Sequence, residues 1–198
     1  MEVVNAPATY ALIVVNVVIS LYALYGDGRF FDQFMFQVRA VTERDEQYRI
    51  VTSSFLHANL PHLLLNMLTL YFFGPVVEAT LGKLGFLVVY FGAIIASGFL
   101  SLWLNRKSPL YSSVGASDAV SGVVLSYCCF YPLDKIYVMM IPVGIPAFLY
   151  GLMFMFISAQ LMGREDRVIA HEGHLGGAVA GAVLTVIMQP YVVTRFFS

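Results

Sequence analysis

The chain contains little charge. Only 12% of its 198 residues are Asp, Glu, Lys or Arg, whereas a soluble domain has about 25%. Its net charge of -1 provides no excess of basic residues, which argues against a nucleic-acid surface. The two cysteines, Cys128 and Cys129, are adjacent, and this spacing fits neither a disulfide framework nor a metal site. We interpret them as packing residues.

The chain is instead rich in apolar sequence, with 59% hydrophobic residues. Several runs reach the roughly 20 residues that a helix needs to cross a bilayer. The N-terminus lacks the basic region of a secretory signal and the arginines of a transit peptide, so we interpret the first run as a permanent helix. We predict an all-α polytopic membrane protein with six transmembrane helices in one domain, residues 1–198. The segments are expected at about 8–25, 60–81, 84–104, 117–131, 136–162 and 171–192.

The first connection, residues 27–49, mixes phenylalanines with charged residues. Such a composition is typical of a segment in the membrane interface, but an extramembrane loop folded on itself is an equal alternative. Lysine and arginine counts in the short loops are too even to set the orientation.

The fourth segment is short, at about 15 residues or roughly 22 Å of helix. A bilayer core is about 30 Å thick, so we expect this helix to begin below the membrane surface. Ser117, at its start, would then lie at the bottom of an indentation open to water. Non-helical backbone at 114–116 is compatible with that depth only where it lines such a cavity. In the fifth segment, Pro142 and Pro146 are expected to kink or break the beginning of the helix.

Polar residues stand at the mouths of three apolar segments. Ser117 follows Gly115, whose missing side chain gives steric access. His174 begins a segment in which Gly173, Gly177 and Gly181 share one face and allow another helix to approach closely. If that helix is the fourth, His174 is placed to accept the Ser117 proton.

The other polar cluster begins the second segment. His62 and Asn66 lie four residues apart, hence on one helix face, and both can donate hydrogen bonds to an oxyanion. We expect His57 to hold the loop before them.

A zinc site is the competing interpretation of the histidines. His171 and His174 are three residues apart, whereas the HExxH motif of zinc proteases needs a spacing of four, so no metal is predicted. His171 remains an alternative general base to His174.

The ordered set of motifs resembles the rhomboid intramembrane serine proteases over essentially the whole chain, as a basic six-helix core. The matching residues are Glu46-Gln47-Tyr48-Arg49, His57 with His62 and Asn66, Gly74 with Glu78 and Gly82, Gly115-Ala116-Ser117, and His174-Leu175-Gly176-Gly177 with Gly181.

This resemblance implies a Ser117–His174 dyad, with His62, Asn66 and the Ser117 backbone N–H stabilising the oxyanion. The supporting residues it implies are Arg49, His57, Glu78, Gly115, Gly177 and Gly181. It also implies an endopeptidase that cuts transmembrane segments of other proteins near the membrane surface, with the lipid bilayer as its surroundings and no cofactor. The expected location is the cell membrane, as a multi-pass protein.

The chain departs from the family motif G-x-S-G at Asp118, which replaces the last glycine. We expect the carboxylate to cap the N-terminus of the fourth helix, where negative charge is favourable. The departure keeps open a second function, an inactive rhomboid-like protein that binds transmembrane helices. A transporter of metal ions or small solutes is a third possibility. Substrate identity and oligomeric state are not predicted.

Overall fold

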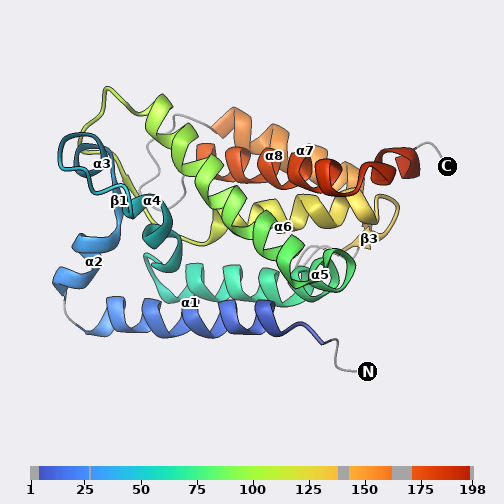
Figure 1. Ribbon diagram of the computed structural model, residues 1–198, viewed down its shortest axis with the longest axis horizontal. Coiled ribbons are helices and arrows are strands. Elements are labelled where there is room, and N and C mark those ends of the chain that lie inside the picture. Colours follow the sequence, from blue (N-terminus) through green and yellow to red (C-terminus); the bar gives the residue numbers. More distant parts are fainter. Residues whose placement is uncertain (1–4, 27, 138–142, 162–170, 197–198) are drawn as a thin grey trace.

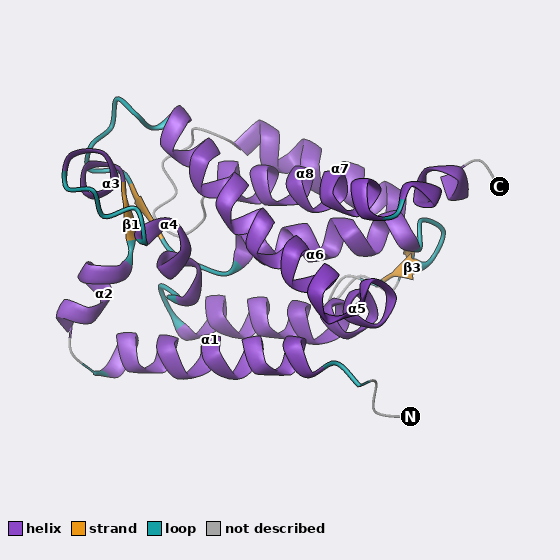
Figure 2. Ribbon diagram, in the orientation of Figure 1, coloured by secondary structure: helices purple, strands orange, loops and turns teal. Residues whose placement is uncertain are grey.

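Helices dominate the structure, as the apolar segments predict (Figures 1 and 2). The computed structural model describes residues 5–26, 28–137, 143–161 and 171–196. The elements in chain order are α1 (Pro7–Tyr25), α2 (Gly28–Phe34), β1 (Phe36–Gln37), α3 (Val38–Glu43), α4 (Arg49–Thr52), η1 (Ser53–Phe55), α5 (Leu60–Leu104), β2 (Ser112–Ser113), α6 (Ser117–Phe130), β3 (Lys135–Ile136), β4 (Ile145–Pro146), α7 (Ala147–Leu161), α8 (His171–Met188) and η2 (Pro190–Phe196).

The predicted second and third segments form the two halves of α5. They meet at Gly82, where the backbone leaves the helical conformation with φ 72° and ψ 165°. A positive φ strains residues that carry a side chain, so glycine is the residue suited to this break. The first half begins after Asn59, whose side-chain oxygen accepts the backbone N–H of His62 at 2.9 Å.

The predicted start of the fifth segment, at residue 136, is wrong. Lys135–Ile136 form β3, which pairs with Ile145–Pro146 of β4, and the helix begins only at Ala147. Proline favours extended backbone in the residue before it and suits the entry of a helix, so the helix starts directly after Pro146. Pro142 lies outside the described residues. The last helix also ends earlier than residue 192, where its segment was expected to end, because α8 stops at Met188 and Pro190 begins η2.

Helix α6 occupies the centre of the bundle, between α5, α7 and α8 (Figure 1). It is buried on most sides, as a core helix must be. Its closest neighbour is α8, which approaches through glycines. A methyl group added at Gly177 would overlap with the backbone of Asp118, and one at Gly181 would overlap with the backbone of Gly122. These glycines therefore allow the backbones of α6 and α8 to come into direct contact.

The first connection is folded and packs against the segment that precedes α6. Its side chains Phe36, Val38 and Val41 form a small core with Ile50. Strand β1 pairs with β2, so that Phe36 lies opposite Ser113. The connection thus has a core of its own, and its depth in a membrane stays a prediction.

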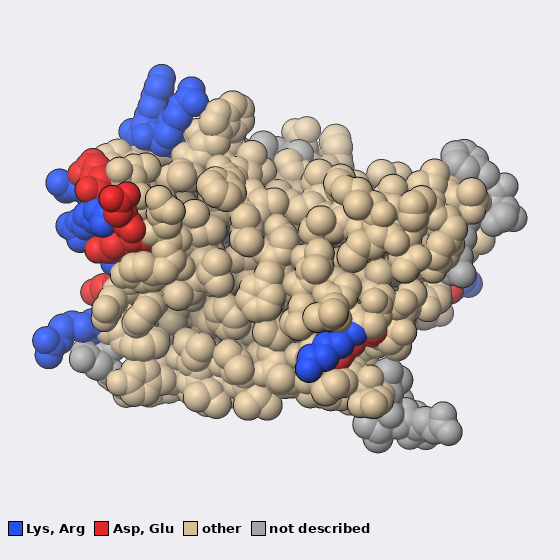
Figure 3. Space-filling model, viewed as in Figure 1, with Lys and Arg blue, Asp and Glu red and all other residues tan. Residues whose placement is uncertain are grey.

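The outer surface of the bundle is apolar along the sides of the helices, between the two ends of the bundle. Charged side chains gather mostly at the end that carries α2, α3 and α4 (Figure 3). Large apolar side chains on the long helices point outward, among them Val18, Phe72, Phe99 and Ile187. So wide an exposed apolar surface is typical of contact with lipid. By length and hydropathy, α1 and α5 could cross a membrane, while α6, α7 and α8 are shorter apolar helices.

The glycine contact between α6 and α8 can be tested by adding one methyl group. We expect Gly177→Ala and Gly181→Ala each to lower the free energy of unfolding by about 1–3 kcal/mol or more, because the clash is with backbone and cannot be relieved by a rotamer change. Gly28→Ala is the control, since nothing lies within 4 Å of a methyl group there. Thermal unfolding in detergent measures the difference, and equal melting temperatures for all three variants would contradict the contact.

Candidate active site

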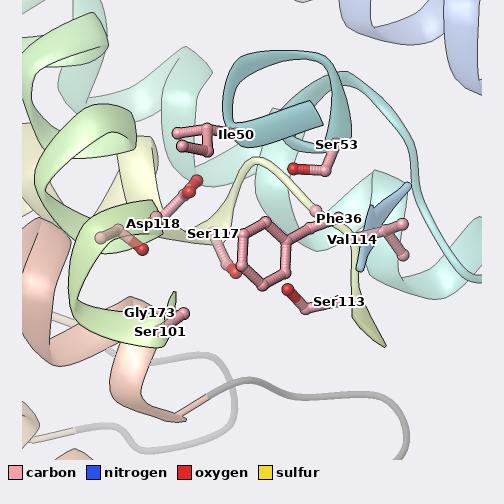
Figure 4. A pocket seen from close by; sticks show the side chains of 12 residues that line it. Phe36, Ile50, Ser53, Ser101, Ser113, Val114, Ser117, Asp118 and Gly173 are labelled. Atoms are coloured by element: carbon pink, nitrogen blue, oxygen red, sulfur yellow. The ribbon is translucent and has the colours of Figure 1, made fainter. Parts of the chain in front are cut away.

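Ser117 is the first residue of α6 and lines a small polar cavity (Figure 4). The cavity has a volume of about 30 Å³, which is enough to hold a water molecule. Its polar wall consists of Ser53, Ser97, Ser101, Ser113 and Asp118. Phe36 from the first connection and Ile50 from α4 add an apolar side. Ser117 is thus half-buried beside a space that can admit water.

Gly115 brings two of the predicted site residues together. Its φ of 131° is one that residues with a side chain rarely adopt. A Cβ atom at this position would lie 2.6 Å from Cε1 and 2.9 Å from Nε2 of His62, and 3.6 Å from Oγ of Ser117. The imidazole and the hydroxyl therefore lie beside the same point of the backbone. Any side chain at residue 115 would fill the space against which His62 packs.

His57 contacts both α1 and the turn before α6. It is fully buried, and its Nδ1 lies 2.7 Å from Oγ of Ser20 on α1. The backbone N–H of Ala116 donates to its Nε2 at 3.4 Å, and Oγ of Ser20 donates to the carbonyl of Phe55 at 2.9 Å. These directions require His57 to be neutral and to carry its proton on Nδ1.

Burial keeps His57 neutral. Burial, and to a smaller extent the neighbouring His62, lower the pKa of the imidazole from 6.5 to about 3. The two rings pack edge to face with centroids 5.1 Å apart. A proton on Nε2 would point at the N–H of Ala116, so protonation would break the contact that holds the turn.

His62 and Asn66 lie on one face of the first turns of α5, as their spacing predicts. Nδ2 of Asn66 donates to the carbonyl of His62 at 3.1 Å, which leaves a second N–H on the amide. Nδ1 of His62 is buried and has no hydrogen-bond partner among the described residues. Both side chains thus retain hydrogen-bonding capacity, and His62 retains it beside Ser117.

His174 lies in the first turn of α8, stacked on the ring of Phe154 with centroids 5.9 Å apart. Gly173, directly before it, lines the cavity of Ser117, and Gly177 contacts the backbone of Asp118. His174 therefore lies at the same end of the α6–α8 crossing as Ser117. The side chain of His171 is outside the described residues, so the choice between the two histidines, and the zinc alternative, stay untested.

Two supporting residues lie away from Ser117 and hold other parts of the fold. Arg49 is 5% exposed and donates to the backbone carbonyls of Asp32 at 2.7 Å and Met35 at 2.9 Å. It also forms an ion pair with Glu46, so the E-x-Y-R residues close the first connection.

Glu78 has the corresponding role for α1. It accepts the backbone N–H groups of Ala8 at 2.9 Å and Thr9 at 2.7 Å, and the hydroxyl of Thr9 at 2.8 Å. Its carboxylate thus satisfies free N–H groups in the first turn of α1 and fixes that helix to α5.

The sequence matches known proteins of one family. A sequence model of the Rhomboid domain matches residues 44–191. The chain belongs to the rhomboid family. It is 32% identical to mitochondrial rhomboid protein 1 of Saccharomyces cerevisiae over 179 residues, which cover 88% of this chain and 51% of that protein.

Other rhomboid relatives match shorter regions. Presenilin-associated rhomboid-like protein A of Danio rerio, named as mitochondrial, is 30% identical over 67% of this chain and 35% of its own length. Inactive RHOMBOID-like protein 8 of Arabidopsis thaliana is 36% identical over 44% of this chain and 25% of its own length. The chain thus spans about half or less of the length of these rhomboid relatives, and one of them is named inactive.

Two acidic residues form contacts at the rhomboid site that the sequence did not reveal. Glu172, 7% exposed, accepts a hydrogen bond from Nδ2 of Asn105 at 3.0 Å and another from the hydroxyl of Tyr111. Burial and this carboxylate raise the pKa of Tyr111, which keeps its proton in the bond. Asp118 accepts a hydrogen bond from the hydroxyl of Ser54. In the sequence, Glu172 could be noticed as a charged residue beside an apolar segment, which often has a functional role. Nothing in the sequence indicates that Asn105 and Tyr111 are its partners.

The neutral state of His57 predicts an acid-sensitive fold. The unfolded chain binds a proton below pH 6.5 that the folded chain does not bind until about pH 3. The free energy of unfolding therefore falls as the pH drops through this range, by at most about 1.4 kcal/mol per pH unit. We expect His57→Gln to flatten the decline, measured as melting temperature in detergent from pH 7 to pH 4. A decline equally steep in the variant would show that other groups cause it.

Proposed function

We propose that the chain is an intramembrane serine endopeptidase with Ser117 as nucleophile and His174 as general base. The observation that carries the proposal is the shared position of Ser117 and His62 beside Gly115. A nucleophile next to a hydrogen-bond donor is the arrangement that acyl transfer needs. Membership of the rhomboid family supports it, and so does the α6–α8 crossing, which brings the first turns of both helices to one end.

In the proposed reaction, Oγ of Ser117 attacks the carbonyl carbon of a peptide bond while its proton passes to His174. The tetrahedral intermediate collapses to an acyl-enzyme when His174 returns the proton to the leaving amine. A water molecule, which the cavity beside Ser117 can hold, then attacks the ester and releases the second product and the free serine.

The oxyanion would be stabilised by groups from two helices. The backbone N–H of Ser117 lies at the N-terminus of α6, where unpaired N–H groups and the helix dipole favour negative charge. His62 and the second N–H of Asn66 would add donors from α5. Such donors, fixed in advance around the developing charge, usually make a large contribution to catalysis.

We further propose that all six apolar segments, with α5 counted as two, cross the membrane, and that the substrates are transmembrane segments of other proteins. The apolar outer surface supports this topology, since water would solvate it poorly. At 14 residues, α6 is about 21 Å long, shorter than the roughly 30 Å bilayer core, which supports a submerged Ser117. The cell membrane remains our prediction for the location, although two of the relatives are named as mitochondrial.

A catalytically inactive rhomboid-like protein that grips membrane helices is the second candidate. The observation that favours it is Asp118, which stands where the family motif has glycine. One relative in the family, from Arabidopsis thaliana, is itself named as inactive. Under this alternative the aspartate would silence an otherwise intact dyad.

Covalent labelling separates the two candidates. The purified protein in detergent is treated with a fluorophosphonate probe, which reacts with activated serines. We expect the wild type to be labelled, Ser117→Ala to lose all label because the nucleophile is gone, and His174→Ala to react at least about a hundredfold more slowly because the general base is missing.

Ser112→Ala is the matched control, because Ser112 is exposed and lies five residues before Ser117. It should be labelled like the wild type. A folded wild-type protein that takes no label would rule out the protease proposal. Label retained in Ser117→Ala would assign the reactivity to another residue.

A further inference from the structure

Asp118 forms a contact that the family motif, with glycine at this position, cannot form. Its Oδ2 accepts a hydrogen bond from Oγ of Ser54 in η1 at 3.0 Å. Its Oδ1 accepts the backbone N–H of Ala119 at 2.8 Å, an N–H group in the first turn of α6, although the N-cap residue of the helix is Ala116. One carboxylate therefore joins the first turn of α6 to the segment 53–57, which we call the bracing segment.

The bracing segment also holds the two residues that precede Ser117. The backbone N–H of Gly115 donates to the carbonyl of Ser53 at 3.1 Å. The N–H of Ala116 donates to Nε2 of His57 at 3.4 Å. With Asp118, the bracing segment thus contacts residues 115, 116 and 118 and flanks Ser117 on both sides.

The aspartate reaches this position without forcing α6 away from α8. Gly177 of α8 packs against the backbone of Asp118, so the close approach depends on the missing side chain of Gly177 rather than on a small residue at 118. The carboxylate instead accepts the hydrogen bond from Ser54. Asp118 itself lines the cavity together with Ser53 and Ser117 (Figure 4). Volume at residue 118 therefore does not by itself disrupt the site.

We propose that Asp118 is a positioning residue, which through Ser54 fixes the bracing segment to α6 and so sets the orientation of the turn that carries Ser117. The part of this inference that concerns the reactivity of Ser117 rests on the proposed protease function. A glycine at 118 leaves the turn held by backbone and His57 contacts alone. Displacement of a nucleophile by about 1 Å can lower a rate by about a hundredfold.

The test compares the wild type with Asp118→Gly, Asp118→Asn and Ser54→Ala in two measurements. Hydrogen exchange, followed by mass spectrometry of peptides covering residues 111–118, reports how firmly the amides of Gly115 and Ala116 are held. The second-order rate of fluorophosphonate labelling reports the reactivity of Ser117. Melting temperatures identify any variant that is not folded.

We expect Asp118→Gly and Ser54→Ala each to exchange several-fold faster in this peptide and to label about tenfold more slowly. Asp118→Asn should keep most of the wild-type behaviour, because its oxygen can accept from Ala119 and its NH₂ group can donate to Ser54. The double variant Asp118→Gly/Ser54→Ala should be no worse than Asp118→Gly, since both changes remove one contact. If Asp118→Gly does not fold, Ser54→Ala tests the same hydrogen bond.

Unchanged exchange in the folded variants, or labelling of Asp118→Gly at or above the wild-type rate, would overturn the inference. A labelling rate of Asp118→Gly above that of the wild type would mean that the aspartate silences the dyad. A third outcome combines faster exchange in the variants with a folded wild type that takes no label. It would support the role of Asp118 in holding the turn and refute the protease function. The two proposals therefore fail in distinguishable ways.

Discussion

The direct backbone contact between α6 and α8 is the constraint on which the site depends. Helices in lipid gain little from burying apolar side chains against one another, so they associate mainly through close packing. Gly177 and Gly181 on α8 and Gly122 on α6 remove the side chains that would hold the two helices apart. Because α6 begins at Ser117 and α8 begins at His171, this crossing brings both of their first turns to one end of the bundle.

The polar groups of the interior show a second constraint. A buried donor or acceptor without a partner is costly, and several buried polar side chains find their partners in another part of the fold. Glu78 joins α5 to α1, and Arg49 closes the first connection. His57 links α1 to the turn before Ser117, and Glu172 links α8 to the end of α5. The residues that a catalytic site needs in fixed positions are thus held by the same bonds that stabilise the bundle.

The sequence predicts the helices better than the contacts between them. Hydropathy places α1, both halves of α5 and α6 within one or two residues, and Gly82 marks the break in α5. The predicted start of α7 is too early, because residues 136–146 are apolar enough to continue a helix, although Ile136 and Ile145 pair as parts of the strands β3 and β4. Hydropathy reports the preference for an apolar environment and does not report backbone pairing.

The site divides in the same way. Glycine spacing indicates the face through which α8 meets α6, and the spacing of His62 and Asn66 indicates their common face. The contact of Asp118 with Ser54 joins residues 64 positions apart and depends on how η1 lies over α6. Serine is too common for its place in the sequence to suggest such a partner. Long-range polar contacts therefore require the structure.

The account rests on functional contact between Ser117 and His174, and the reactivity of a thiol tests that contact most directly. Ser117→Cys is prepared in a chain with Cys128→Ala and Cys129→Ala, with and without His174→Ala, and its alkylation by iodoacetamide is followed at pH 7. A neighbouring imidazole stabilises the reactive thiolate, so the account predicts alkylation that is at least about tenfold faster when His174 is present. Equal rates in the two folded proteins would contradict a Ser117–His174 dyad.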